Sequence, residues 1–161
     1  MWIVFFLHGM APGFWTPALT NILKAGGLQE WVAVVFVVPP LCALVSPLIG
    51  GALADQRIAA NRLYAWTSLI GGACLLAAFL ALWAAWNPWW FVILLGLYSM
   101  CSAPACGLLT TVALANLQQG ERRFPLVRLG ATLGWMAGGM ITSFLLHAVT
   151  SPVAGLGAGV A

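Results

Sequence analysis

The chain has 161 residues, of which 63% are hydrophobic and 6% are charged, and its net charge is +3. A soluble domain carries roughly 25% charged residues, so this composition excludes a water-exposed globular fold. The few charges lie at expected loop positions and form no basic patch, which argues against a nucleic-acid partner. No metal-ligand spacing, phosphate loop or pair of nucleophile and base is apparent, so we expect neither a cofactor nor an enzyme.

Charges and turn residues divide the chain into five apolar stretches, each long enough to cross a hydrocarbon core of about 30 Å as a helix. None of them alternates apolar and polar residues as the strands of a barrel do. We therefore predict an all-α integral membrane protein. Its transmembrane helices are expected at about 2–23, 31–54, 63–86, 88–116 and 124–149, and a short Gly-rich tail at 150–161.

Prolines are frequent inside these stretches, as at Pro12 and Pro17 in the first and Pro104 in the fourth. A proline in a membrane helix frees a carbonyl, which a neighbouring helix or a watery cavity must then satisfy. This suits a transporter, although kinks that only shape the packing are an equal alternative. Pro88 is expected at the first turn of the fourth helix, behind a tight Trp-rich hairpin.

The arginines indicate how the chain is oriented. The loops after the second and fourth predicted spans hold four of them, at 57, 62, 122 and 123, whereas the opposite side holds only Lys24. Because Lys and Arg accumulate in cytoplasmic loops, we expect the N-terminus in the cytoplasm. The tryptophans at 86, 89 and 90 then lie at the outer interface, where indole rings are enriched.

A short charged turn follows the second predicted span and reads Gly51-Ala52-Leu53-Ala54-Asp55-Gln56-Arg57, with Arg62 behind it. It places a carboxylate at the cytoplasmic end, where it can pair with an arginine. The segment resembles the hallmark G-x-L-[AS]-D-[RK]-x-G-R-[RK] of the major facilitator superfamily in its first half and departs from it in the second. The resemblance implies a cytoplasmic gate made of Gly51, Asp55, Arg57 and Arg62; an ordinary charged turn is the alternative.

The predicted fifth helix has two different faces. At 100° per residue, Arg128, Thr132 and Trp135 share a narrow stripe, and this stripe can donate hydrogen bonds and stack on a flat ring. A series of glycines at 130, 134 and 138 lies roughly opposite and can press backbone to backbone against a neighbouring helix. Taken alone, Arg128 could instead extend to the cytoplasmic interface, as long basic side chains near helix ends do.

The start of this helix, Phe124-Pro125-Leu126-Val127-Arg128 through Trp135, is similar to the F-P-x-[IV]-R-x-x-G-T-[IL]-G-[FW] pattern of the nucleoside:H+ symporter family within that superfamily. The resemblance implies a major-facilitator N-terminal bundle, incomplete here, whose partners are membrane lipid, a nucleoside, a proton and the missing C-terminal helices of the transporter. It also implies proton-coupled uptake at a bacterial inner membrane, with Arg128, Thr132 and Trp135 binding the substrate.

His8 is the candidate for proton coupling, because an imidazole can exchange a proton near neutral pH. A histidine that only forms a packing hydrogen bond between helices is the alternative. The function itself has two alternatives: a major facilitator transporter of another small solute, such as a sugar, or a membrane fragment that packs with other helices without transporting.

Overall fold

The computed structural model describes residues 1–54, 60–116, 120–145, 147 and 149–160, with the backbone alone at 47–54, 120–122 and 160. Helices account for nearly all of this part of the chain, and it contains no strand, which confirms the predicted all-α class. In chain order they are α1 (Trp2–Trp15), α2 (Leu19–Ala25), the 3-10 turn η1 (Gln29–Trp31), α3 (Val32–Ala54), α4 (Ala60–Trp83), α5 (Pro88–Asn116), α6 (Gly120–Met140), the π-helical η2 (Ile141–Leu145) and α7 (Val153–Val160).

The first predicted span is helical but interrupted at Pro17, between α1 and α2. Proline has no N–H group, so the carbonyl of Gly13 loses its usual donor. Ala18 then bonds to the carbonyl of Trp15 at 3.1 Å, three residues back instead of four. The helix axis therefore restarts at α2, a short segment that ends at Lys24-Ala25 before two glycines.

The hairpin between α4 and α5 follows from its residues. Ala85 adopts a left-handed conformation with φ 53°, and the N–H of Trp86 bonds back to the carbonyl of Ala81 at 3.0 Å, which closes α4. The side chain of Asn87 accepts the N–H of Trp89 at 3.1 Å and caps α5. Pro88 is the first residue of α5, as predicted.

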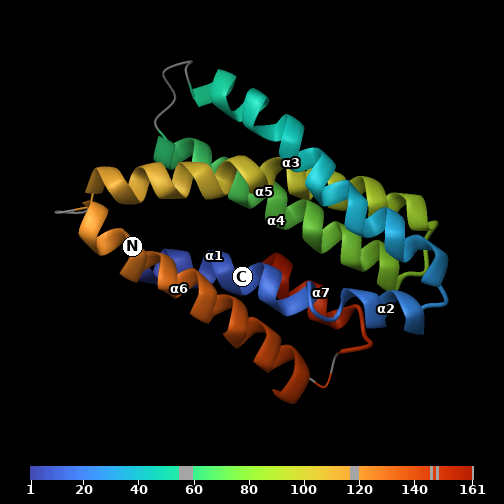
Figure 1. The fold of residues 1–161 in the computed structure, drawn as a ribbon. Helices are drawn as coiled ribbons and strands as arrows, with labels where there is room; N and C mark the ends of the chain where they lie inside the picture. The colour runs from blue at the N-terminus through green and yellow to red at the C-terminus, as the bar shows by residue number, and fades with distance from the viewer. Residues whose placement is uncertain (55–59, 117–119, 146, 148, 161) are drawn as a thin grey trace.

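The helices pack in two groups (Figure 1), with α3, α4 and α5 on one side and α1, α6 and α7 on the other. The main pairs are α1 with α6 and α7, α5 with α3 and α4, and α4 with α7. The same five helix pairs result when the labels are exchanged, α1 for α5, α3 for α6 and α4 for α7. Two related three-helix units produce such a pattern, and internal repeats of this kind are characteristic of transporter bundles.

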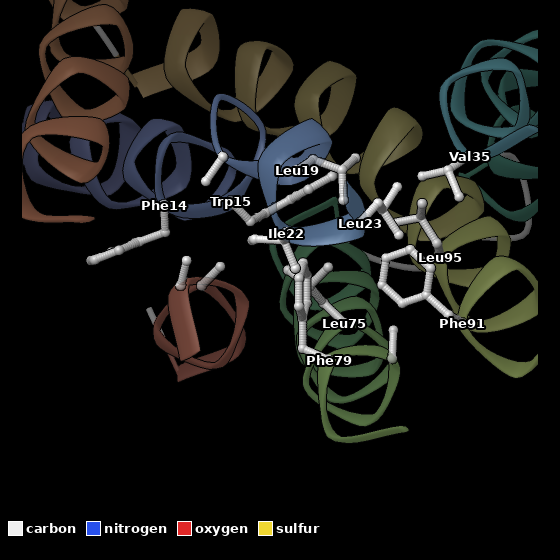
Figure 2. Packing of buried hydrophobic residues seen from close by; sticks show 14 of the residues in the cluster. Phe14, Trp15, Leu19, Ile22, Leu23, Val35, Leu75, Phe79, Phe91 and Leu95 are labelled. Carbon is white, nitrogen blue, oxygen red and sulfur yellow. The ribbon is translucent and has the colours of Figure 1, made fainter. Parts of the chain in front are cut away.

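The main buried cluster joins both groups at the end of the molecule where α2 lies. Figure 2 shows side chains from α1, α2, α4 and α5 meeting there, with Val35 of α3 beside them. Its largest fully buried members are Phe79, Leu19, Ile22, Leu23, Leu75 and Leu95. Edge-to-face contacts link Phe79 to Trp15 and Phe91, with ring centroids 6.0 and 5.5 Å apart. The short α2 is thereby held in place by apolar packing.

The outer surface is strongly apolar, as a lipid environment requires. Large hydrophobic side chains such as Leu44, Leu69 and Phe144 are 74%, 65% and 72% exposed. Within the described residues, three stretches are long and apolar enough to cross a membrane, at Gln29–Ser46, Ala60–Trp83 and Pro88–Asn116. In the predicted fifth span, α6 runs into the π-helical η2 at Ile141. Within the expected Gly-rich tail, Val153–Val160 form helix α7, which packs on α1 and α4.

Candidate functional site

Helices α1 and α6 pack closely against each other, and glycines make the contact. A Cβ atom added at Gly134 would overlap the carbonyl of Phe6, and one at Gly138 would lie 2.5 Å from the carbonyl of Met10. On the other helix, Gly9 and Gly13 meet the backbone of Ala131 and Trp135 in the same way. The predicted glycine face of this helix is therefore confirmed: it presses backbone to backbone against α1.

The two glycines on α1 were not predicted to make this contact, although their spacing of four residues is the usual sign of a close helix contact. The contact continues at the end of α6, where the hydroxyl of Thr142 donates to the carbonyl of Phe14 at 2.9 Å. The two helices thus form one interlocked unit, with no side chain between their backbones at Gly9, Gly13, Gly134 and Gly138.

The opposite face of α6 carries the three predicted substrate-binding residues. Arg128, Thr132 and Trp135 are all exposed, Trp135 to 45%. None of the three side chains forms a hydrogen bond with another residue that the structure describes. These side chains are therefore available to bind a group outside the described structure. Their polar groups point away from α1, since the glycines of the same helix occupy that side.

The predicted cytoplasmic gate is described only in part. Gly51 lies in the last turns of α3, whereas Asp55 and Arg57 lie outside the described residues. Arg62 is exposed near the start of α4, where its backbone N–H donates to the side chain of Asn61 at 2.9 Å. The gate therefore stays a prediction.

The predicted proton-coupling residue, His8, lines a cavity of about 370 Å³ that lies between α1, α4, α5 and α7. Most of its lining is apolar, but six polar side chains reach it: His8, Tyr64, Thr67, Ser68, Tyr98 and Ser102. His8 lies here beside Tyr64, with ring centroids 6.0 Å apart and planes inclined by 52°. The cavity is remote from the outward face of α6, because the glycine contact separates the two.

The other polar residues of the cavity were not predicted. One signal was present: Tyr64 and Ser68 on α4 and Tyr98 and Ser102 on α5 repeat the same Tyr-x-x-x-Ser spacing, which puts each serine one helical turn after its tyrosine. Helices α4 and α5 pair along their length, and this pairing brings both sets of residues to one cavity. The pairing is a property of the tertiary structure.

The hydroxyls of the bundle divide into satisfied and unsatisfied groups. Thr67 donates to the carbonyl of Leu63 at 2.9 Å, and Ser99 to that of Leu95 at 2.8 Å, each within its own helix. The hydroxyl of Ser68, in contrast, is buried without a hydrogen-bond partner among the described residues, as is the indole N–H of Trp15. A buried polar group without a partner is costly, so the hydroxyl of Ser68 is available to bind a polar group in the cavity.

A helical bundle that is apolar outside, with polar side chains in an internal cavity and on an outward helix face, is typical of integral membrane proteins that bind a small polar solute. The chain belongs to the nucleoside H+ symporter family, whose sequence model matches residues 1–154. It is also 28% identical over 147 residues to the "Putative nucleoside transporter YegT" of Escherichia coli (strain K12). That match covers 90% of this chain and 32% of the relative, so the chain spans about a third of the relative's length. No solved structure matches the chain.

Proposed function

We propose that the chain is the N-terminal part of a proton-coupled nucleoside transporter that works by alternating access. The observation that carries this proposal is the two-sided α6, whose glycines lock onto α1 while Arg128, Thr132 and Trp135 stay exposed on the other side. Family membership supports the nucleoside and the proton as cargo. Since the chain spans about a third of its relative, further helices would supply the other wall of the substrate site.

The three side chains of this face suit a nucleoside. The guanidinium of Arg128 donates to a carbonyl or hydroxyl oxygen, and the hydroxyl of Thr132 donates or accepts one further bond. The indole of Trp135 offers a plane for the base, a contact worth about 1–3 kcal/mol. From residue 128 to residue 135 the helix rises roughly 10 Å, which is comparable to the length of a nucleoside.

The proposal includes a gate and a coupling residue. Gly51, Asp55, Arg57 and Arg62 would close the cytoplasmic end, the carboxylate pairing with an arginine in one state and releasing it in the other. His8 would exchange the proton, since an imidazole titrates near neutral pH. Inward and outward states alternate when one helical unit rocks against another around a fixed site.

A split-transporter assay tests the function. The chain is co-expressed with the part of the E. coli relative that lies beyond the matched region, in cells without nucleoside uptake of their own. We expect uptake of labelled uridine or adenosine when both parts are present, lost on collapse of the proton gradient. Arg128→Gln and Thr132→Val should each lower uptake roughly 5- to 150-fold, because a lost polar contact costs roughly 1–3 kcal/mol.

The matched control is Leu133→Ala, which removes a half-exposed apolar side chain from the same helix and should leave uptake within about twofold. If uptake requires the chain but tolerates both polar substitutions, the chain only packs against other helices and the substrate site lies elsewhere. If labelled sugars are taken up and nucleosides are not, the solute class is wrong while the transporter class stands.

A further inference from the structure

We propose that the cavity between α1, α4 and α5 is a protonation site, in which His8 takes up the proton and Tyr64 and Ser68 hold the protonated ring. The proposal rests on the proposed function, because it names the residues that would bind the coupling proton. It separates the proton site from the substrate face of α6, which lies on the other side of the α1–α6 contact.

The cavity provides one group with suitable chemistry. Its titratable residues are His8 on α1, Tyr64 on α4 and Tyr98 on α5, and no charged side chain is among the residues that line it. From the other helices that pack on α1, α6 presents glycines and α7 contributes Ala158. A phenol keeps its proton throughout the physiological range, whereas an imidazole changes charge between about pH 5 and 8. His8 is therefore the proton acceptor of this cavity.

Two hydroxyl groups line the same cavity as the ring of His8, those of Tyr64 and Ser68. The ring of Tyr64 is in contact range of His8, and Ser68 follows Tyr64 by one turn on the same wall, its hydroxyl buried and without a partner. An imidazolium has two N–H donors and no acceptor. The phenol oxygen of Tyr64 and the hydroxyl of Ser68 can each accept one of these bonds, directly or through a water. At about 370 Å³ the cavity has room for several waters.

The proton step is a simple transfer. A hydronium ion that enters the cavity gives its proton to the unprotonated ring nitrogen of His8, so that an N–H bond forms, an O–H bond breaks and a neutral water remains. The reverse transfer to water releases the proton. The charge that appears on His8 in an apolar bundle must be solvated, and this favours wider spacing of α1 from α4 with more water in the cavity.

The interlocked helices connect this event to the substrate face. His8 directly precedes Gly9, at which the backbones of α1 and α6 touch, and Gly134 holds the contact one turn further. Because closely packed backbones do not deform independently, a shift of α1 carries α6 with it. Arg128 and His8 thus lie on the two outer sides of one unit, and protonation at one side repositions the binding groups at the other.

The experiment uses the full 161-residue chain in lipid nanodiscs, with its histidines labelled for NMR. The chain has two histidines, and His147, exposed and outside the helices, serves as internal control. We expect the His8 signal to change reversibly with pH, as that of an imidazole that gains and loses a proton does. Tyr64→Phe should move the midpoint of this change by about 0.5 pH unit or more. A His8 signal that does not titrate, or one that Tyr64→Phe leaves in place, would overturn the proposal.

A second measurement tests the link to α6. Spin labels replace two exposed leucines, Leu69 on α4 and Leu129 on α6, in a background without the native cysteines. We expect their distance distribution to change between pH 5.5 and 7.5, and expect His8→Gln to abolish that change. A distribution that stays constant in the unmodified chain contradicts the link. Neither measurement uses a nucleoside. If the split-transporter assay shows no nucleoside uptake, the proposed substrate is wrong, but the results on the proton site still stand.

Discussion

The hydroxyl of Thr142 donates a 2.9 Å hydrogen bond to the carbonyl of Phe14, which lies 128 residues earlier in the chain. Phe14 precedes the break at Pro17, where the N–H of Ala18 bonds to Trp15 and leaves the Phe14 carbonyl without its helical donor. Thr142 stands in the π-helical segment that follows α6, so a side chain of this segment satisfies the carbonyl freed in α1; the same hydroxyl also lies 3.1 Å from the carbonyl of Gly138 in its own helix. A neighbouring helix therefore donates the hydrogen bond that the carbonyl freed by a proline break needs inside a membrane.

Thr142→Val should destabilise the bundle by about 0.5–2 kcal/mol, because the Phe14 carbonyl would stay buried without a donor. Reversible unfolding in mixed micelles measures this loss. Thr110→Val is the matched control, since the hydroxyl of Thr110 bonds only to Cys106 within its own helix, at 2.9 Å. If both variants lose the same stability, the contact between the two helices contributes nothing of its own.

The glycine contact predicts a second stability difference. Gly134→Ala places a methyl group against the backbone of Phe6 and Met10, which cannot move away as a flexible side chain could. We expect a loss of about 1–3 kcal/mol and a widened gap between α1 and α6. Gly107→Ala on α5, where a methyl group meets nothing within 4 Å, should instead gain about 0.5–1 kcal/mol. Equal effects of the two substitutions would contradict the interlocked pair.

The docking of α7 gives a third prediction. A Cβ atom at Gly155 would overlap the ring of Phe79, which is fully buried in the main cluster. Gly155→Ala should therefore displace α7 from α4, and Phe79→Leu in the same chain should restore part of the contact by removing the ring. Protease protection of the segment 150–161 reports the docking. A docked α7 in the single variant would show that the ring can move at little cost.

Much of the fold could be predicted from local patterns. The 100° spacing on α6 separated Gly134 from Arg128 correctly, because a helix fixes which residues share a face. Asn87 and Pro88 marked the start of α5, because both carry a specific helix-start chemistry. The cavity could not be predicted, since His8, Tyr64 and Tyr98 come from three helices whose pairing depends on tertiary packing. The same is true of the bond from Thr142 to Phe14.

The substrate roles of Arg128, Thr132 and Trp135 depend on a further step. Their common exposure follows from the helix and from the glycines opposite. The ligand that they bind also depends on residues of the second bundle, because a site at the junction of two bundles is lined by both. A single helix face can therefore be located from sequence, whereas its ligand needs the functional assay.

The orientation of the chain can be tested at two exposed positions on opposite ends of the bundle. Asn87 lies in the hairpin before α5, and Asn116 is the last residue of α5. Because arginines are retained on the cytoplasmic side, we expect Asn87→Cys, in a background without native cysteines, to react with an impermeant maleimide on intact cells. Asn116→Cys, at the exposed end of α5 that we expect in the cytoplasm, should react only after the cells are lysed. Labelling in the reverse order would place the N-terminus outside and would make the gate of Asp55 and Arg62 an external one.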